Sequence, residues 1–323
     1  MKIVITGGAG FLGGALARRL LDAGTCAVGG VDAEVTELVL ADVHPPASDL
    51  GEDPRVTVST GPLGDDTGLL AGAGLVFHLA GVVSSAAEAD FDLGMRTNVD
   101  GLRWVLERCR AEPAPPVLVF TSSLAVYGSD PAMAPVTAVD DDTLPRPQSS
   151  YGVQKFIGEQ LVADYTRKGF VRGRSVRLMT VVVRPGRPNA AASSFLSGIV
   201  REPLAGERAT CPVPPDTPVA LSSPARTLDG ILRAAAVDDS SWGSTTAMNL
   251  PALTTTPREM VEALDRVADG RPSELVDWRD DPAVGAIVRA WPARFETARA
   301  RALGLQPEQR FEDIVRAYLD EVR

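Results

Sequence analysis

The pair of residues best suited to acid–base chemistry is Tyr151 and Lys155, a tyrosine and a lysine four positions apart. In a helix this spacing puts both side chains on one face. A free tyrosine has a pKa of about 10 and is a poor base at neutral pH, but a neighbouring ammonium group favours the phenolate. Lysine is rare in this chain, with Lys2 and Lys168 as the other two. The pair therefore predicts a tyrosine that takes the proton of a substrate hydroxyl, with a lysine as its partner.

The hydroxyl residues Thr121-Ser122-Ser123 leave an apolar stretch at 116–121 that is predicted to be a buried strand. A hydroxyl at that edge of a sheet can hydrogen-bond a substrate oxygen and help to polarise it. Serines at strand ends also form turns, so this prediction depends on the motifs around it.

A glycine-rich turn, TGGAGFLG at 6–13, directly follows the first apolar stretch. Glycines at positions 7, 10 and 13 permit a tight turn, in which backbone N–H groups and a helix N-terminus approach a pyrophosphate. A turn that binds no ligand is the alternative, and the place directly after the first strand favours dinucleotide binding.

An acidic residue at the end of the second strand predicts which cofactor is bound. Asp42 ends the stretch ELVLAD, where a carboxylate accepts hydrogen bonds from the adenosine ribose and repels a 2′-phosphate, favouring NAD over NADP. Asp32 is the alternative and lies at a more usual distance from the glycine turn. We favour Asp42 because ELVLAD has the better strand pattern and the Gly-rich, Val-rich residues before it are typical of an insertion.

A parallel sheet is needed to position these groups. Apolar stretches alternate with helical stretches in the first half of the chain, which predicts an α/β fold, a Rossmann-type doubly wound parallel sheet. The predicted strands lie at 2–6, 37–42, 55–59, 75–79, 116–121 and 174–185, and the predicted helices at 11–22, 92–110 and 150–167.

The sequence pattern changes after residue 185, where proline becomes frequent and apolar stretches no longer alternate regularly with helical ones. Amphipathic helices are predicted at 257–268 and 306–323. We expect an NAD-binding Rossmann domain over 1–185, rejoined by about 224–250. A smaller C-terminal substrate-binding part, over 186–223 and 251–323, would then form a lid.

Composition narrows the possible functions. A net charge of −10 argues against binding to nucleic acid or to an anionic membrane. No apolar run reaches the length of a membrane-spanning helix, and the chain opens on a strand pattern rather than a signal peptide, so a cytoplasmic protein is expected. Three dispersed cysteines and two histidines predict neither disulfides nor a metal site.

In combination, several motifs resemble those of the extended short-chain dehydrogenase/reductase superfamily, of the NAD-dependent epimerase/dehydratase type, over the first 185 residues. These are TGGAGFLG, HLAG at 78–81, Asn98, TSSLAVYG at 121–128 and YGVQK at 151–155. The resemblance implies NAD as cofactor and a catalytic set of Ser123, Tyr151 and Lys155. It also implies a homodimer formed through the helices near 92–110 and 151–167. The implied cofactor-binding residues are Gly7, Gly10, Phe11, Leu12, Gly13, Asp42, Leu63, Leu79, Ala80, Asn98, Tyr151 and Lys155.

A narrower resemblance, to the D-erythronate 2-dehydrogenases, covers nearly the whole chain. It is carried by the segments at 87–101, 164–178, 182–195, 201–207, 211–217, 222–224 and 291–295. That family oxidises the C2 hydroxyl of a four-carbon sugar acid with NAD, so a carboxylate-binding cation is implied. Arg184 is the first candidate, because a guanidinium binds a carboxylate in a two-pronged geometry. Ser123 also belongs to the implied substrate-binding set, and Asn189, Ser193 and Ser222 are candidates for hydroxyl contacts.

Some positions depart from the family pattern and leave the exact substrate open. Pro62 stands where the family has an acid near the adenine, Met179 stands where it has proline, and 218–221 lacks an aromatic residue. A biosynthetic dehydrogenase of a related hydroxy acid therefore remains an alternative. So does a nucleotide-sugar epimerase or dehydratase, for which Arg187 and Arg201 are the few cations available to a diphosphate. A cofactor-binding sensor without chemistry is disfavoured, because the chain keeps all three catalytic residues.

Overall fold

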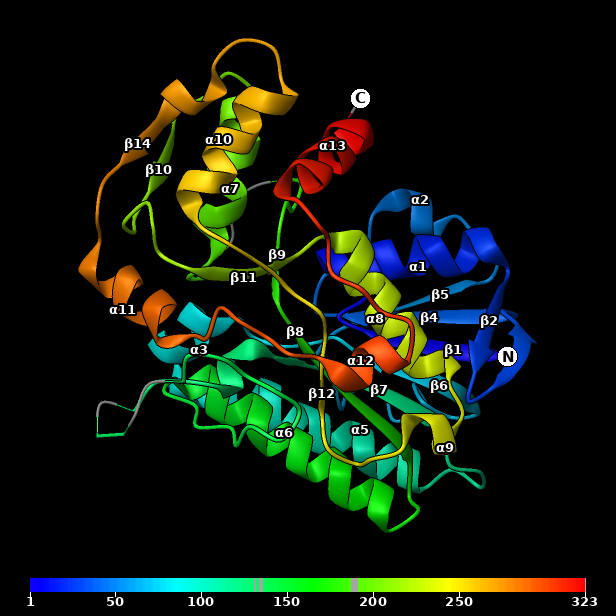
Figure 1. The fold of residues 1–323 in the computed structure, drawn as a ribbon. Helices are drawn as coiled ribbons and strands as arrows, with labels where there is room; N and C mark the ends of the chain where they lie inside the picture. The colour runs from blue at the N-terminus through cyan, green and yellow to red at the C-terminus, as the bar shows by residue number, and fades with distance from the viewer. Residues whose placement is uncertain (131, 134–135, 187–190, 323) are drawn as a thin grey trace.

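The computed structural model (Figure 1) describes residues 1–130, 132–133, 136–186 and 191–322. Its centre is a seven-stranded sheet in the order β12-β8-β7-β6-β1-β4-β5, with all neighbours parallel. The strands are β1 (Lys2–Thr6), β4 (Glu37–Asp42), β5 (Val56–Thr60), β6 (Ala73–His78), β7 (Val117–Ser123), β8 (Arg172–Leu178) and β12 (Met248–Asn249). The strand order reverses between β1 and β6, where ligands bind in such sheets. The predicted Rossmann-type α/β fold is confirmed.

Helices cover both faces of this sheet (Figure 1). Ile3 and Ile5 of β1 face one core, together with α1 (Phe11–Ala23) and α8 (Pro224–Ala236). Val4 points the other way, into a core shared with α5 (Gly101–Arg110) and α6 (Ser150–Arg167). Because successive side chains of a strand alternate between faces, an uninterrupted apolar strand such as IVI fits a sheet that is buried on both sides.

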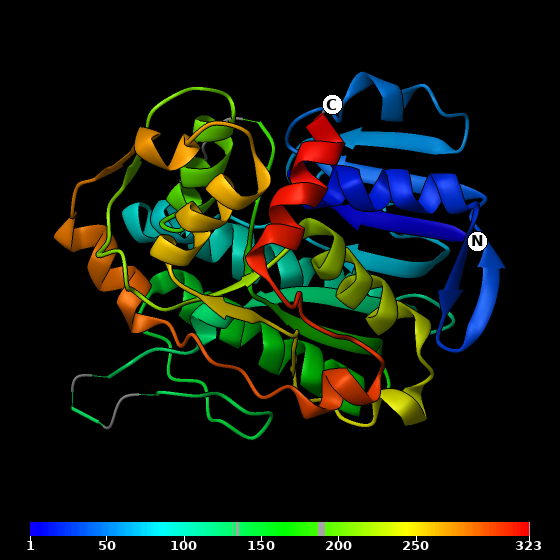
Figure 2. The ribbon, with the colours of Figure 1, turned by 45° about the horizontal axis from the view of Figure 1, so that its top comes forward.

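A second hydrophobic core lies beside the sheet, built mainly by residues after 181. Three helices make most of it: α7 (Ser194–Leu204), α10 (Pro257–Val267) and α13 (Phe311–Val322). In Figures 1 and 2, α13 lies between the α7 and α10 cluster and the α1 side of the sheet. Further elements here are β10 (Ala209–Cys211) paired with β14 (Val276–Trp278), α11 (Pro282–Ala290), and a small sheet of β9 (Thr180–Val181), β11 (Val219–Ser222) and β13 (Leu253–Thr255).

The remaining elements are short. They are α2 (Ser48–Gly51), α3 (Ser84–Ala89), α4 (Phe91–Gly94), a π-helical turn (Met95–Asp100), α9 (Asp239–Trp242), α12 (Ala298–Ala302) and 3-10 turns at Leu124–Val126 and Pro272–Leu275. None of the helices in the described part of the chain is long and apolar enough to cross a membrane.

Three elements differ from the sequence predictions. The stretch before β4 forms a hairpin, β2 (Thr25–Val28) and β3 (Val31–Glu34), closed by Gly29 and Gly30 at positive φ. Two such glycines suit a two-residue hairpin turn. The strand predicted at 174–185 is divided between β8 and β9, which belong to different sheets, and the last helix begins at Phe311 rather than 306.

Candidate active site

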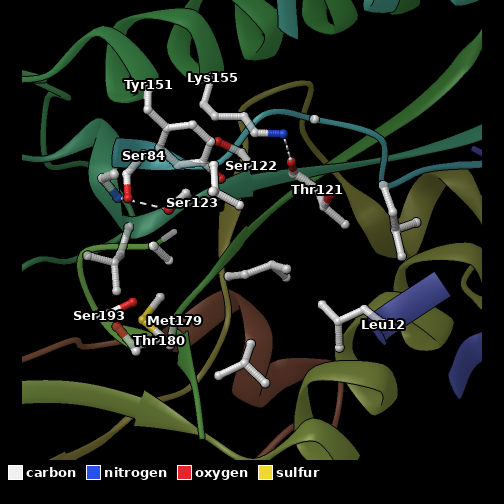
Figure 3. Close-up of a pocket in the computed structure, with 18 of the residues that line it drawn as sticks. Leu12, Ser84, Thr121, Ser122, Ser123, Tyr151, Lys155, Met179, Thr180 and Ser193 are labelled. Carbon is white, nitrogen blue, oxygen red and sulfur yellow. Dashed lines mark hydrogen bonds between the residues drawn. The ribbon is translucent and has the colours of Figure 1, made fainter. Parts of the chain in front are cut away.

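A cavity of about 370 Å³ lies at the carboxyl ends of the parallel strands. It runs from the glycine turn after β1, past the end of β7, to Ser193 at the start of α7 and to Trp291, which packs against the second core. In Figure 3, Tyr151 and Lys155 descend from α6 on one side of the cavity, and Met179, Thr180 and Ser193 lie on the opposite side. The cavity therefore connects the glycine-rich turn at 6–13 with Tyr151 and Lys155.

The glycine turn has the geometry of an anion cradle. Gly7 has φ +75°, and a Cβ on Gly13 would lie 2.1 Å from the Gly7 carbonyl oxygen. Only glycine at position 13 lets α1 approach the turn this closely. No side chain caps the N-terminus of α1 at Gly10, so its first N–H groups remain available to a ligand. Phe11 and Leu12 line the cavity beside this helix end.

Asp42 and Asp32 occupy very different positions. Asp42 ends β4 beside the glycine turn, where its carboxylate accepts hydrogen bonds from the N–H groups of Ala9 (3.1 Å) and His44 (3.3 Å). Asp32 is exposed in the β2–β3 hairpin. That hairpin joins the amino end of β1, because the Met1 amino group donates to the Glu34 carbonyl oxygen. Of the two acids, only Asp42 lies next to the turn.

The other residues expected to bind the cofactor lie around this end of the sheet. Leu79 lines the cavity, and a Cβ on Gly7 would touch the backbone of Ala80 at 2.7 Å. Leu63 lies in a small neighbouring pocket and packs against α5. The Asn98 side chain is buried: its amide oxygen accepts from the Val82 N–H (2.8 Å), and its amide nitrogen donates to the side-chain oxygen of Gln154 (2.7 Å). It thereby ties the loop after β6 to α6.

Local packing positions Tyr151 near the end of β7. The N-cap Ser149 accepts a hydrogen bond from the Gly152 N–H at 3.2 Å. A Cβ on Gly152 would lie 2.1 Å from the Ala125 carbonyl oxygen, so this glycine lets α6 approach the turn after β7. The Tyr151 hydroxyl is consequently within hydrogen-bonding reach of Ser123.

Lys155 lies one helical turn further along α6 and is buried. Its ammonium group donates to the Thr121 carbonyl oxygen (2.9 Å) and lies 5.7 Å from the centre of the Tyr151 ring (Figure 3). Burial lowers the pKa of Lys155 to about 8, and the nearby Glu159 carboxylate opposes this shift.

Burial raises the pKa of Tyr151 to about 12, while the hydrogen bond with Ser123 and the charge of Arg184 oppose the rise. The sequence predicts Lys155 as the cation that favours the phenolate. In the structure a second cation, Arg184, lines the same cavity as Tyr151 and lowers the pKa of Tyr151. The two residues are 33 positions apart, so no spacing pattern connects them.

Arg184 is held in place through its backbone by α7. Its N–H donates to the Ser197 hydroxyl (3.1 Å), and its carbonyl oxygen accepts from the Arg201 guanidinium (2.8 Å). Burial and the charge of Arg201 lower the pKa of Arg184. Within the described residues no carboxylate pairs with the Arg184 side chain. A partly buried guanidinium without a counter-ion suits an anionic ligand.

The other expected substrate contacts are not all brought together. Ser193 lines the cavity. Ser222 does not line it, because its side chain is buried and donates to the Ser223 carbonyl oxygen. Asn189, like Arg187, lies outside the described residues. No group of metal-ligating side chains occurs in the part of the chain that the structure describes.

The structure also contains a buried ion pair that the sequence pattern did not predict. Arg177 of β8 binds both carboxylate oxygens of Glu159, at 2.8 and 2.7 Å, and both side chains are almost fully buried. Ser122 donates to the same carboxylate at 2.5 Å. Glu159, Arg177 and Ser122 together link α6, β8 and β7. Breaking a pair of this kind leaves an uncompensated buried charge.

Comparison with known proteins gives consistent matches. The sequence profile of the NAD dependent epimerase/dehydratase family matches residues 3–218. A D-erythronate dehydrogenase of Cupriavidus necator is 49% identical over 99% of this chain and 98% of its own length, and one of Haemophilus influenzae is 39% identical over 99% of both. A solved structure described as a nucleoside-diphosphate-sugar epimerase from Agrobacterium tumefaciens is 36% identical, covers 99% of this chain and 94% of that one, and has a TM-score of 0.90.

Proposed function

The chain belongs to the NAD dependent epimerase/dehydratase family, and we propose that it is an NAD-dependent dehydrogenase that oxidises the C2 hydroxyl of D-erythronate to the 2-oxo acid. The observation that carries this proposal is the cavity that contains both Tyr151, hydrogen-bonded to Ser123, and Arg184, whose side chain has no carboxylate partner among the described residues. A base and a cation in one cavity suit a hydroxy acid. Similarity over the full length to two D-erythronate dehydrogenases supports the same substrate.

NAD fits the residues present. The uncapped N-terminus of α1, the close-packed glycines 7 and 13, and Asp42 beside them would hold its pyrophosphate and adenosine ribose. The carboxylate at position 42 disfavours a 2′-phosphate. When bound, NAD supplies the acceptor for the hydride that leaves C2.

The chain's own residues carry the proton chemistry. Arg184 binds the substrate carboxylate, and Ser123 hydrogen-bonds the C2 oxygen. The Tyr151 phenolate takes the hydroxyl proton as the C2–H bond breaks and the C2 carbonyl forms. Lys155 is proposed to hold the ribose of the nicotinamide half and to favour the phenolate. Residues 186–223 and 251–323 form the substrate-binding part in this proposal, and Ser193 contributes a hydroxyl contact.

NADH formation by the purified protein tests the proposed function. NAD or NADP is supplied with D-erythronate, with its C2 epimer D-threonate, and with sugar acids of other lengths. Rapid NADH formation with D-erythronate and NAD, and slow turnover with NADP, is expected. If a different sugar acid is oxidised and D-erythronate is not, D-erythronate is not the substrate. If NAD binds but no sugar acid is oxidised, the protein is not a dehydrogenase of sugar acids.

A nucleotide-sugar epimerase is the second candidate, favoured by the similarity to the Agrobacterium tumefaciens structure. It would need cations for a diphosphate, and among the described residues that line the cavity Arg184 is the only arginine. An epimerase regenerates its cofactor in each cycle. Epimerisation of a nucleotide sugar without net NADH formation would therefore favour this candidate over the dehydrogenase.

We also propose that the protein is a cytoplasmic homodimer. Three apolar side chains are exposed on and beside the helices expected to form the interface, namely Phe91 (60%), Val153 (43%) and Leu93 (36%). The cysteines are free and buried, in keeping with a reducing compartment. Light scattering coupled to size-exclusion chromatography should give twice the 34.0 kDa chain mass, and a single chain mass would contradict the dimer.

A further inference from the structure

Trp291 lies where the catalytic cavity meets the second hydrophobic core. It directly follows α11, and its backbone N–H donates to the Val288 carbonyl oxygen (3.2 Å). Its partly buried side chain packs against the second core and also against a small cluster of Leu124, Met179 and Ala220. The indole therefore connects the residues next to Ser123 with those of the C-terminal part.

A second, much smaller cavity of about 10 Å³ lies behind this indole. Leu124, Thr180 and Trp291 line both this cavity and the catalytic one, so together they form the wall between them. The far side of the small cavity is apolar, with Val219 and Val288 among its lining residues. At this volume it is at the lower limit for one water molecule.

Of the three wall residues, Trp291 has the bulk that sets the depth of the catalytic cavity. Leu124 is almost fully buried in the turn after Ser123, and Thr180 is fixed by its pairing with Leu221 in the small sheet. The indole is the largest of the three side chains, and the small cavity behind it shows that other side chains do not pack closely against that side of the ring. Its removal would join the two cavities.

We propose that Trp291 limits the chain length of the sugar acid, and this inference rests on the proposed function. With the carboxylate at Arg184 and the C2 oxygen at Ser123 and Tyr151, the remaining carbons extend toward the wall beside Ser123. A four-carbon acid ends at this wall. A longer acid would place additional atoms against the indole, and additional hydroxyls there would lose water without gaining partners.

Selectivity measurements on Trp291→Ala test the proposal. Wild-type and variant protein are compared by kcat/KM for D-erythronate, for its 4-O-methyl ether, and for a five-carbon acid with the same C2 and C3 configurations. The methyl ether adds bulk without a further hydroxyl donor, so it suits the apolar space behind the wall. A hydrophobic pocket discriminates one methylene by roughly 10- to 200-fold. We therefore expect kcat/KM for the ether, divided by kcat/KM for D-erythronate, to be at least about tenfold higher in Trp291→Ala than in wild type.

Val288→Ala is the matched control, because Val288 lines only the small cavity and leaves the wall intact. This variant should keep the wild-type ratio. Trp291→Leu keeps part of the apolar contact and still shortens the wall, so it serves as the second variant if alanine prevents folding. It should shift the ratio in the same direction.

An unchanged ratio in folded Trp291→Ala or Trp291→Leu, with D-erythronate still oxidised, would overturn the inference. An equal shift in Val288→Ala would overturn it as well, because general loosening of the core would then be the cause. A wild-type protein that oxidises no sugar acid would overturn the proposed function and this inference with it. The two failures are thus distinguishable.

Discussion

Replacing Arg184 with methionine removes the charge proposed to bind the substrate carboxylate and keeps an unbranched apolar side chain of similar reach. The guanidinium is partly buried and has no carboxylate partner in the described chain, so an acid bound there gains a charge-assisted hydrogen bond in a poorly hydrated site. Truncating one partner of such a pair costs roughly 2–5 kcal/mol. At about 1.4 kcal/mol per factor of ten, kcat/KM for D-erythronate should fall roughly 30- to 4,000-fold.

The same substitution should change the pH dependence. Arg184 lowers the pKa of Tyr151, which burial raises to about 12. In the proposed mechanism the phenolate is the base, so kcat/KM should rise with pH as Tyr151 loses its proton in the free enzyme. Loss of the positive charge raises the pKa of Tyr151 and moves this rise to higher pH. Arg184→Lys keeps the charge and loses the two-pronged geometry, so its kcat/KM should fall less and its pH profile should stay close to that of wild type.

Initial rates of NADH formation over a range of pH, together with NAD affinity from calorimetry, measure these effects. Erythritol is the control substrate, because it lacks the carboxylate and should be oxidised equally poorly by wild type and by Arg184→Met. The proposed role of Arg184 is refuted if Arg184→Met oxidises D-erythronate as efficiently as wild type, or if its pH profile is unchanged.

Three further substitutions test the remaining parts of the site. Tyr151→Phe keeps the ring and removes the base, so turnover should fall about 100- to 10,000-fold while NAD still binds in a fluorescence titration; normal turnover would contradict its role. Asp42→Ser removes the carboxylate beside the glycine turn, and the kcat/KM preference for NAD over NADP should fall roughly 10- to 150-fold, as expected for a charged hydrogen bond; an unchanged preference would exclude Asp42 as the selector. Gly13→Ala would place a Cβ 2.1 Å from the Gly7 carbonyl oxygen, so NAD affinity and the melting temperature should both fall, and unaltered NAD binding would show that the turn is not the cofactor cradle.

Features carried by a single element were predictable from the sequence. The turn between β1 and α1 follows from three glycines after an apolar strand, and α6 from the spacing of Tyr151 and Lys155. The double layer of helices follows from strands that are apolar on both faces. The hairpin at 25–34 was missed, although Gly29-Gly30 is a hairpin signal, because the stretch was interpreted only as an insertion before β4.

Features that depend on contacts between distant segments were not predictable. The Glu159–Arg177 pair joins a helix to a strand, and its members show no spacing pattern. Arg184 was predicted as a carboxylate ligand through resemblance, but its effect on Tyr151 arises only because the fold brings both side chains to the same cavity. Trp291 reaches the cavity from beyond α11, and nothing in its local sequence indicates that contact.

The central claim is that the protein removes hydride from C2 of D-erythronate with net reduction of NAD. The most direct test supplies D-erythronate deuterated at C2 together with unlabelled NAD, and analyses the reduced cofactor and the product by mass spectrometry. We expect one deuterium in the reduced nicotinamide and none in a four-carbon 2-oxo acid. Unlabelled NADH would place the oxidation at another carbon, and label retained in the acid without net cofactor reduction would contradict a dehydrogenase.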